Sequence, residues 1–234
     1  MRVHAYLEPI PNFTYFWTEK RIWSKTMLGA KDDILKDDIL REAQKLFQQF
    51  GLKKTTMEDI AKAMGKGKST LYYYFSSKEE IFDAVVMKEM EELFNSVKLA
   101  VQKACSAEDK LKAFTLTKIK AVQKKANLYK LVKGEMQDTI RCMKHLRTQY
   151  DIREINLVKE ILSFGIENGE FLREISDDLD ILPSVMVSSL RGLERDIFTE
   201  NRYAKLEPRM ESIMTIMIRG LRNETTITNN KIVA

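Results

Sequence analysis

Two short helical patterns joined by a glycine-containing turn occupy residues 55–75, TTMEDIAKAMGKGKSTLYYYF, and no other stretch constrains the fold as strongly. Thr55 or Thr56 can cap the first helix, because Thr55 and Glu58 have the spacing of a capping box. Gly65 is placed to end that helix. Two short helices joined by such a turn predict a helix-turn-helix.

The second helix of this motif, roughly residues 68–75, is expected to carry different chemistry on its two faces. Leu71 and Phe75 are four residues apart and share the buried face. Tyr72 and Tyr73 then point largely elsewhere, where a phenol can donate to a phosphate oxygen while its ring packs on a sugar or a thymine methyl group. Because such a helix enters the major groove, we expect double-stranded DNA as a partner. The alternative is that the tyrosines only cover a small core.

Positive charge is concentrated around this motif. Residues 53–78 contain six lysines and two acids, a net charge of +4, whereas the whole chain carries +5. The lysines are Lys53, Lys54, Lys62, Lys66, Lys68 and Lys78. A phosphate-binding surface needs local charge of this kind.

The rest of the chain favours helices. Only 4 Pro and 9 Gly occur in 234 residues, and strong helix formers are abundant. Gly51 is placed to end a helix that leads into the motif. Further helices are expected near 78–104, 107–124, 127–145, 147–168, 177–199 and 206–222. The sequence therefore predicts an all-α protein.

Residues 1–30 differ from the rest, since they hold two of the four prolines, both tryptophans and no clear helical period. Three interpretations remain open: a disordered arm, a segment that packs on the body, or sequence upstream of a natural start at Met27. The third is slightly favoured.

Enzyme and metal chemistry find little support. Cys105 and Cys142 match no metal motif, and Cys142 with His145 lacks a third and a fourth ligand. The GKGKST stretch lacks the spacing of a phosphate-binding loop and has no preceding strand. We expect no enzyme activity, no metal and no cofactor. No run of about 18 apolar residues is present, so we expect a cytoplasmic protein without a membrane partner.

Residues 50–86, FGLKKTTMEDIAKAMGKGKSTLYYYFSSKEEIFDAV, resemble the DNA-binding domain of the tetracycline-repressor (TetR) family of bacterial regulators. The matching elements are Phe50-Gly51, Thr56 through Ile60-Ala61, and Thr70-Leu71-Tyr72 through Phe75, Lys78 and Glu79. Two positions depart from the family pattern: Lys66 replaces a buried aliphatic residue, and Gly67 replaces the usual serine cap.

The resemblance implies a set of DNA-contacting residues. They are Thr55 or Thr56, Lys68, Ser69, Thr70, Tyr72, Tyr73 and Lys78. Lys66, where this chain departs from the family pattern, can extend to a phosphate and is added to the expected set. Within this set, Lys68 and Tyr72 are implied to lie near bases. Phosphate contacts are implied for Thr70, Tyr73 and Lys78.

The resemblance also implies how the chain is divided. The expected parts are an N-terminal extension (1–30), a helix-turn-helix DNA-binding domain of three helices (31–77), a helical ligand-binding and dimerisation domain (78–222) and a tail (223–234). A ligand pocket is expected at Phe94, Val97, Phe114, Leu128, Tyr129, Met136, Met143 and Phe164. A homodimer interface is expected at Met186, Val187, Leu190, Leu193, Ile213, Ile216, Met217 and Leu221. For the residues of both lists, intramolecular core is the competing interpretation.

The implied function is regulation of transcription. A symmetric dimer predicts a near-palindromic operator, and a small apolar effector of unknown identity is expected to release the repressor from it. The alternative is an architectural protein that binds DNA without sequence preference.

Overall fold

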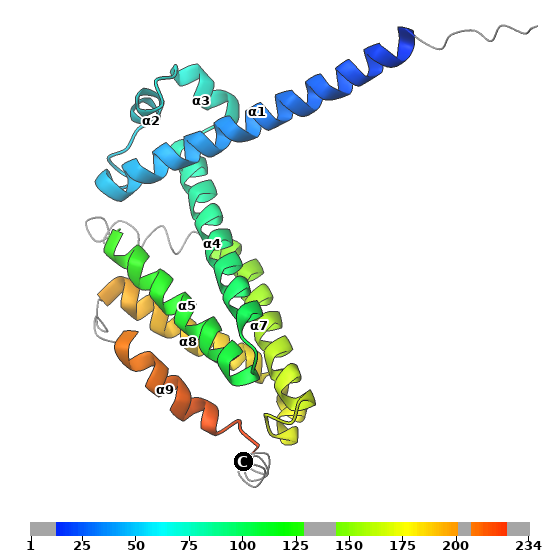
Figure 1. Cartoon of the computed structure of the whole chain (residues 1–234). Helices are drawn as coiled ribbons and strands as arrows, with labels where there is room; N and C mark the ends of the chain where they lie inside the picture. The colour runs from blue at the N-terminus through cyan, green and yellow to red at the C-terminus, as the bar shows by residue number, and fades with distance from the viewer. Residues whose placement is uncertain (1–12, 129–143, 201–206, 224–234) are drawn as a thin grey trace, which may run out of the picture.

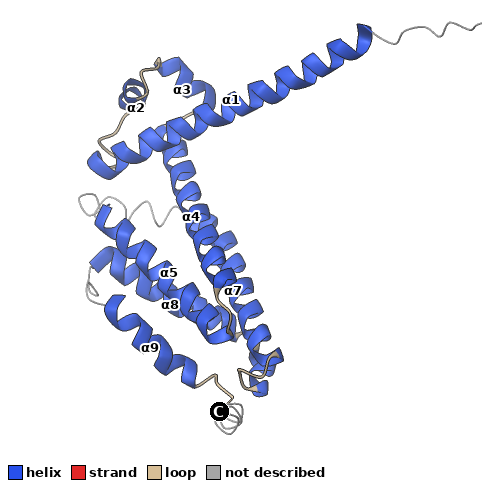
Figure 2. Cartoon of the chain, viewed as in Figure 1, coloured by secondary structure: helices blue, strands red, loops and turns tan. Residues whose placement is uncertain are grey.

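The computed structural model describes residues 13–128, 144–200 and 207–223. Within these ranges the chain forms eight α-helices, one 3-10 helix and no strand (Figure 2). One isolated β-bridge joins Phe171 and Arg222. The elements are α1 (Phe13–Phe50), α2 (Met57–Ala63), α3 (Lys68–Tyr74), α4 (Lys78–Lys103), α5 (Ala107–Leu128), α7 (Lys144–Glu167), the 3-10 helix η2 (Arg173–Asp178), α8 (Leu182–Glu200) and α9 (Glu207–Arg219). The predicted all-α fold is confirmed.

The helix α1 begins far earlier than the sequence pattern suggested. It runs without a break from Phe13, so residues 13–30 are helical, and Figure 1 shows this part projecting away from the other helices. The physical reason is that Pro9 and Pro11 both precede the helix, and no proline follows within it. Residues 13–30 are thus helical although the sequence shows no clear helical period there, while 1–12 lie outside the described residues. The three interpretations of this extension stay open.

A second difference concerns the start of α8. A helix was expected from residue 177, whereas η2 occupies Arg173–Asp178 and α8 begins at Leu182. Pro183 lies in the first turn of α8, where its missing N–H has no intrahelical partner to lose. The proline therefore determines where this helix starts.

The first four helices share a small hydrophobic core, and we call the unit that it holds together (residues 32–85) the head. Phe47 of α1 meets Phe82 of α4 edge to face, with ring centroids 5.2 Å apart. Ile60 of α2 and Leu71 of α3 are fully buried in the same cluster. Two glycines with positive φ, Gly51 (83°) and Gly65 (62°), end α1 and α2, a conformation that other residues adopt only with strain.

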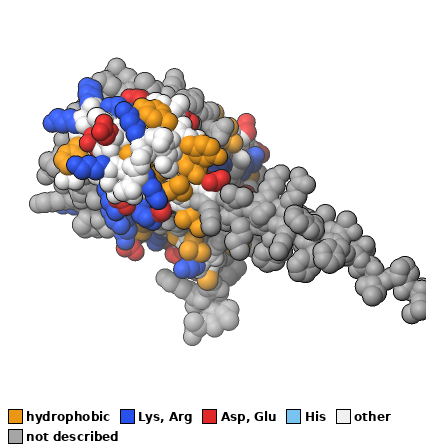
Figure 3. Space-filling view, turned by 90° about the horizontal axis from the view of Figure 1, so that it is seen from above, with side chains coloured by type: hydrophobic (Ala, Val, Ile, Leu, Met, Phe, Trp, Pro, Cys, Tyr) orange, Lys and Arg blue, Asp and Glu red, His pale blue; other side chains and the backbone are white. Residues whose placement is uncertain are grey.

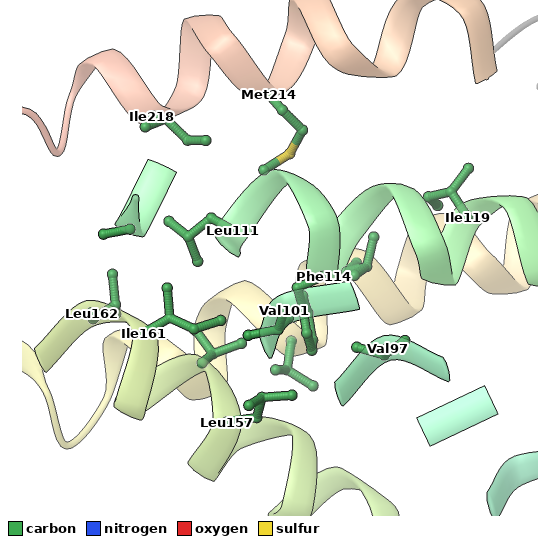
Figure 4. Packing of buried hydrophobic residues seen from close by; sticks show 14 of the residues in the cluster. Val97, Val101, Leu111, Phe114, Ile119, Leu157, Ile161, Leu162, Met214 and Ile218 are labelled. Atoms are coloured by element: carbon green, nitrogen blue, oxygen red, sulfur yellow. The ribbon is translucent and has the colours of Figure 1, made fainter. Parts of the chain in front are cut away.

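A larger core lies below the head and is formed by α4, α5, α7, α8 and α9; we call this part the effector domain. Figure 4 shows Val97, Leu111 and Phe114 converging with side chains of α7 and α9. The helix α4 contributes to both cores, first with Val85 in the head and then with Phe94 in the effector domain. One long helix therefore joins the two units (Figure 1).

Candidate nucleic-acid interface

The start of α2 is fixed by a capping box that differs from the predicted one. Thr56 is the N-cap, and its hydroxyl accepts a hydrogen bond from Asp59 N at 3.1 Å. The Asp59 carboxylate accepts hydrogen bonds in return from the Thr56 hydroxyl at 2.7 Å and from Thr56 N at 2.9 Å, and these two bonds, the hydroxyl first, lower the pKa of Asp59. The expected pair, Thr55 with Glu58, is one residue out of register.

Thr55 is turned away from any DNA surface. Its side chain is 1% exposed, and its hydroxyl donates to the carbonyl of Gly51 at 2.7 Å. The predicted DNA contact of Thr55 therefore disagrees with the structure, because the hydroxyl is used to hold the loop after α1. Of the two threonines, only Thr56 lies on the surface.

The turn between α2 and α3 is tight. The amide of Lys66 reaches back to the carbonyl of Ala61 at 2.9 Å, while Gly65 adopts its positive φ. The Lys66 side chain is exposed, so the basic residue that departs from the family pattern is accommodated in solvent. Gly67 is the N-cap of α3, as expected, and makes no side-chain hydrogen bond there.

The two faces of α3 differ as the sequence predicted. Leu71 is fully buried and Phe75, just after the helix, is nearly so. Tyr72 and Tyr73 are 50% and 75% exposed, which is unusual for large aromatic side chains on a helix of a well-packed domain. Lys68 is also exposed, and its ammonium lies 5.8 Å from the centre of the Tyr72 ring. Of the neighbouring predicted residues, Ser69 is exposed and Thr70 is half-buried.

The third tyrosine has a different environment. The hydroxyl of Tyr74 donates to the carboxylate of Asp32 on α1 at 2.7 Å, and its ring meets that of Tyr73 edge to face. The hydrogen bond to Asp32 raises the pKa of Tyr74 to about 12. Tyr74 therefore anchors α3 on α1, which leaves its two neighbours as the exposed phenols.

Lys78 occupies a position that the sequence analysis assigned to a phosphate contact. In the structure its ammonium donates to the carbonyls of Leu52, Lys53 and Thr55, at 2.8, 3.3 and 3.0 Å. An ammonium has three protons, so these bonds occupy all of them. Lys78 thus ties the start of α4 to the loop between α1 and α2.

Exposed lysines are frequent in the helix-turn-helix and in the loop before it. Figure 3 views this end of the molecule and shows Lys and Arg side chains on several sides of a patch of hydrophobic and uncharged groups. Between α1 and the start of α3 the exposed lysines are Lys53, Lys54, Lys62, Lys66 and Lys68, and Lys68 lies beside the Tyr72 ring. Basic side chains around exposed aromatic rings can bind phosphates while the rings contact sugars and bases.

The predicted pocket residues are only partly covered by the described residues. Phe94, Val97 and Phe114 are buried together in the core of the effector domain, and Phe164 is half-buried against it. Nothing in the described ranges separates a pocket from ordinary core at these four positions. Tyr129, Met136 and Met143, together with the side chain of Leu128, lie outside the described residues.

The predicted dimer residues fall into two groups. Val187 and Leu190 are buried within the protomer, and Met186, Leu193 and Leu221 pack against the same core. The structure thus corrects the expectation for Val187, which is fully enclosed and has no surface to offer a partner. The second group is exposed and consists of Ile213, Ile216 and Met217. The sequence analysis missed Ile181 and Val185, which are also exposed and precede or begin α8.

A buried charged cluster was also missed by the sequence analysis. Lys118 of α5 is 2% exposed, and its ammonium lies 2.7 Å from Glu154 and 2.9 Å from Glu194. Burial alone lowers the pKa of Lys118, but the two carboxylates outweigh this effect and leave the pKa raised. The cluster joins α5, α7 and α8 inside the effector domain. Spacing in the sequence carries no signal for it, since the three residues come from separate helices.

Across the described part of the chain, no helix combines the length and the apolar character that a membrane span requires.

Comparisons with known proteins point to regulators of transcription. Residues 39–85 match the family model of bacterial regulatory proteins of the tetR family. The chain is 26% identical over 147 residues to the HTH-type transcriptional repressor KstR2 of Rhodococcus jostii, across 61% of this chain and 70% of that protein. It is 47% identical over 57 residues to YhgD of Bacillus subtilis, an uncharacterized HTH-type transcriptional regulator, across 23% of this chain and 30% of that protein.

The fold is similar to that of a solved regulator. The crystal structure of a transcriptional regulator from Cytophaga hutchinsonii superposes with a TM-score of 0.65 and 26% identity, across 79% of this chain and 97% of the other. The likeness therefore extends beyond the head into the effector domain.

Proposed function

This chain belongs to the TetR family of bacterial transcriptional regulators, and from that premise we propose that it is a dimeric repressor released from a near-palindromic operator by a small apolar ligand. It acts in the cytoplasm, where its DNA is. The observation that carries the proposal is the outward face of α3, on which Tyr72 and Tyr73 are exposed beside Lys68. A hydrophobic core gains nothing from exposing two phenols, whereas a DNA-reading helix gains donors and stacking surfaces.

The individual roles follow from position on α3. Lys68 and Tyr72 lie one turn apart and face the major groove, where they contact base edges. Thr70 and Tyr73 bind backbone phosphates, together with Ser69 and Lys66 near the start of the helix. Thr56 contributes from the exposed start of α2.

In this proposal Lys53 and Lys54 make the phosphate contact that was expected of Lys78. Withdrawing the Lys78 ammonium would leave three backbone carbonyls without their donor, which opposes its turning toward DNA. Lys53 and Lys54 are exposed on the loop that Lys78 holds, so they bind phosphate and Lys78 positions them. The DNA-binding surface thus keeps positive charge at this loop, supplied by Lys53 and Lys54 in place of Lys78.

Dimerisation is proposed through α8 and α9. The support is a group of large apolar side chains that the single chain leaves exposed: Ile181, Val185, Ile213, Ile216 and Met217. A symmetric helix-turn-helix dimer that binds DNA presents its two recognition helices about 34–36 Å apart, one turn of DNA, so a dimer formed through these side chains predicts operator half-sites about 10 base pairs apart.

Release by a ligand is a matter of linkage. A ligand lowers DNA affinity only if it binds better to a form of the dimer whose two heads are wrongly spaced for the operator. The core around Phe94, Val97 and Phe114 is apolar, which supports an apolar ligand.

Selection of binding sites from a pool of random DNA duplexes tests this function. The proposal predicts enrichment of one sequence with two inverted half-sites about 10 base pairs apart. The competing function, an architectural DNA-binding protein, predicts that the recovered pool remains random. Repeating the selection with Tyr72→Ala should blur the enriched sequence, whereas Tyr74→Phe serves as the matched control on the same helix.

A further inference from the structure

The two hydrophobic cores meet at one charged residue of α4. Val85 is buried in the head and Phe94 in the effector domain, and Glu89 lies between them on the same helix. Glu89 is only 8% exposed, which is uncommon for a carboxylate and requires that it be paired. Removing this carboxylate from water costs free energy that an apolar side chain at the same junction would not cost.

The two carboxylate oxygens of Glu89 are divided between the two units. Oε1 accepts a hydrogen bond from Nε2 of Gln44, on α1 of the head, at 2.6 Å. Oε2 lies 3.1 Å from Nζ of Lys125, on α5 of the effector domain. Lys125 also donates to the backbone carbonyl of Glu89 at 3.0 Å, which fixes the lysine on α4 at this point.

The junction of α1 and α4 beside Glu89 is incompletely filled. A groove of about 240 Å³ runs between the two helices. Asp37 and Gln44 of α1 line it, together with Lys88 and Glu89 of α4. The ion pair of Lys88 with Asp37, at 2.9 Å, crosses the same junction at a more exposed position. Polar contacts around a groove hold α1 less rigidly than the interlocked apolar side chains on either side of it, so α1 can shift here against α4.

We propose that Glu89 is a positioning residue that couples the effector domain to the head, through Lys125 on one side and Gln44 on the other. The inference rests on the proposed function, because it names the route by which a change in the effector domain reaches the DNA-binding surface. When Lys125 is drawn away, the Glu89 carboxylate loses that ammonium, and its hydrogen bond to Gln44 then rearranges as the carboxylate is repositioned. The groove gives α1 the space for that rearrangement. Because α1 carries the core on which α2 and α3 rest, its shift moves α3.

Lys125 is well placed to respond. It lies in the last turn of α5, three residues before the helix ends at Leu128, one of the predicted pocket residues. Movement of that end of α5 changes the distance between Lys125 and Glu89 directly.

The test needs no effector. Lys125→Met keeps the length of the side chain and removes its charge, and hydrogen–deuterium exchange then reports on α1. The coupling predicts that amides of residues 37–47 exchange about five-fold faster or more, and that operator affinity changes by a similar factor, within the usual range of coupling between sites. Lys125→Arg, which keeps the charge, should restore both toward wild type.

Lys112→Met is the matched control. Lys112 is also on α5, is partly buried and pairs with Glu108 at 2.9 Å, but Glu108 belongs to the same helix. Its loss removes the same charge without touching the junction, so exchange in α1 should stay at the wild-type rate.

A double-mutant cycle decides whether the signal passes through Glu89. In the Gln44→Met background, Lys125→Met should have a much smaller effect on exchange in α1, because the link to α1 is already broken. Additive effects, or unchanged exchange in α1 after Lys125→Met with a folded circular dichroism spectrum, would overturn the proposal. Failure to find any operator would instead count against the proposed function, since the exchange experiment is done without DNA.

Discussion

The head and the effector domain are both helical and both held by apolar cores, yet only the head displays its function on its surface. On α3, which is seven residues long, buried Leu71 directly precedes exposed Tyr72 and Tyr73, so the two faces of the helix differ in chemistry as well as in position. In the effector domain the predicted pocket residue Phe114 and its neighbour Leu111 are equally apolar and equally buried. The comparison teaches that an aromatic or basic residue outside a core signals binding, whereas an apolar residue inside one signals only folding.

If the two cores are independent, a substitution in one core should unfold that unit and leave the other folded. Core substitutions have the largest expected effect on stability. Phe47→Ala removes the largest fully buried side chain of the head and should destabilise it by about 3–5 kcal/mol, with loss of operator binding. The helices of the effector domain should keep their protection in hydrogen exchange. Phe114→Ala is the reciprocal variant and should weaken protection of α5 and α7 first. Equal loss of protection in both units from either variant would show that they form one cooperative core.

The exposed apolar face of α9 allows a sharper comparison within the effector domain. Ile216 is 64% exposed in the single chain, so Ile216→Glu should leave the fold intact but place a charge in the dimer interface. An unpaired buried charge should cost about 3–5 kcal/mol of dimer stability, visible as monomer in sedimentation velocity at micromolar protein. Leu99→Glu, on an exposed site of α4, is the control. A dimer that tolerates Ile216→Glu as well as Leu99→Glu must use another face.

Three residues lie in environments that the sequence did not predict: Val187, Thr55 and Lys78. The family resemblance placed Val187 in a dimer interface, but an apolar residue on one face of a helix can equally be buried against the core of its own chain, as Val187 is. Thr55 and Lys78 were misplaced for a different reason. Their partners are the carbonyls of Gly51, Leu52 and Lys53, and a backbone carbonyl is present at every position, so no pattern of side chains reveals such a bond.

What the sequence did reveal was local. The helix stop at Gly65, the buried pair Leu71 and Phe75, and the two outward tyrosines all follow from spacing within one or two turns. The bridge from Gln44 through Glu89 to Lys125 links residues 36 and 45 positions apart, and it became visible only when the helices were packed.

Within the head, Tyr72→Ala should separate base reading from general DNA binding. Loss of a base contact should cost about 1–3 kcal/mol on the operator, with little change on a scrambled duplex. Tyr74→Phe should change both affinities by the same factor, since it removes the hydrogen bond to Asp32 that anchors α3 but no contact with a base. Equal weakening on both duplexes after Tyr72→Ala would assign that residue to the backbone.

The smallest expected effect is on the salt dependence of DNA binding, which distinguishes Lys54 from Lys78. Lys54→Gln should reduce the slope of log affinity against log salt by about 0.9, the expected loss for one phosphate contact. Lys78→Gln should leave that slope nearly unchanged and lower the thermal stability of the head, because its ammonium holds three carbonyls. A reduced slope for Lys78→Gln with an unchanged slope for Lys54→Gln would show that Lys78, and not Lys54, contacts a phosphate.

The most direct measurement is fluorescence anisotropy of the purified protein on the DNA that flanks its own gene, beside a scrambled duplex at matched salt. Specific recognition by the head predicts that the native DNA binds about 10³-fold more tightly or better, with the preference reduced by Tyr72→Ala. Equal affinity for both duplexes, together with equal affinity for every sequence recovered by selection, would contradict the account and leave an architectural DNA-binding protein.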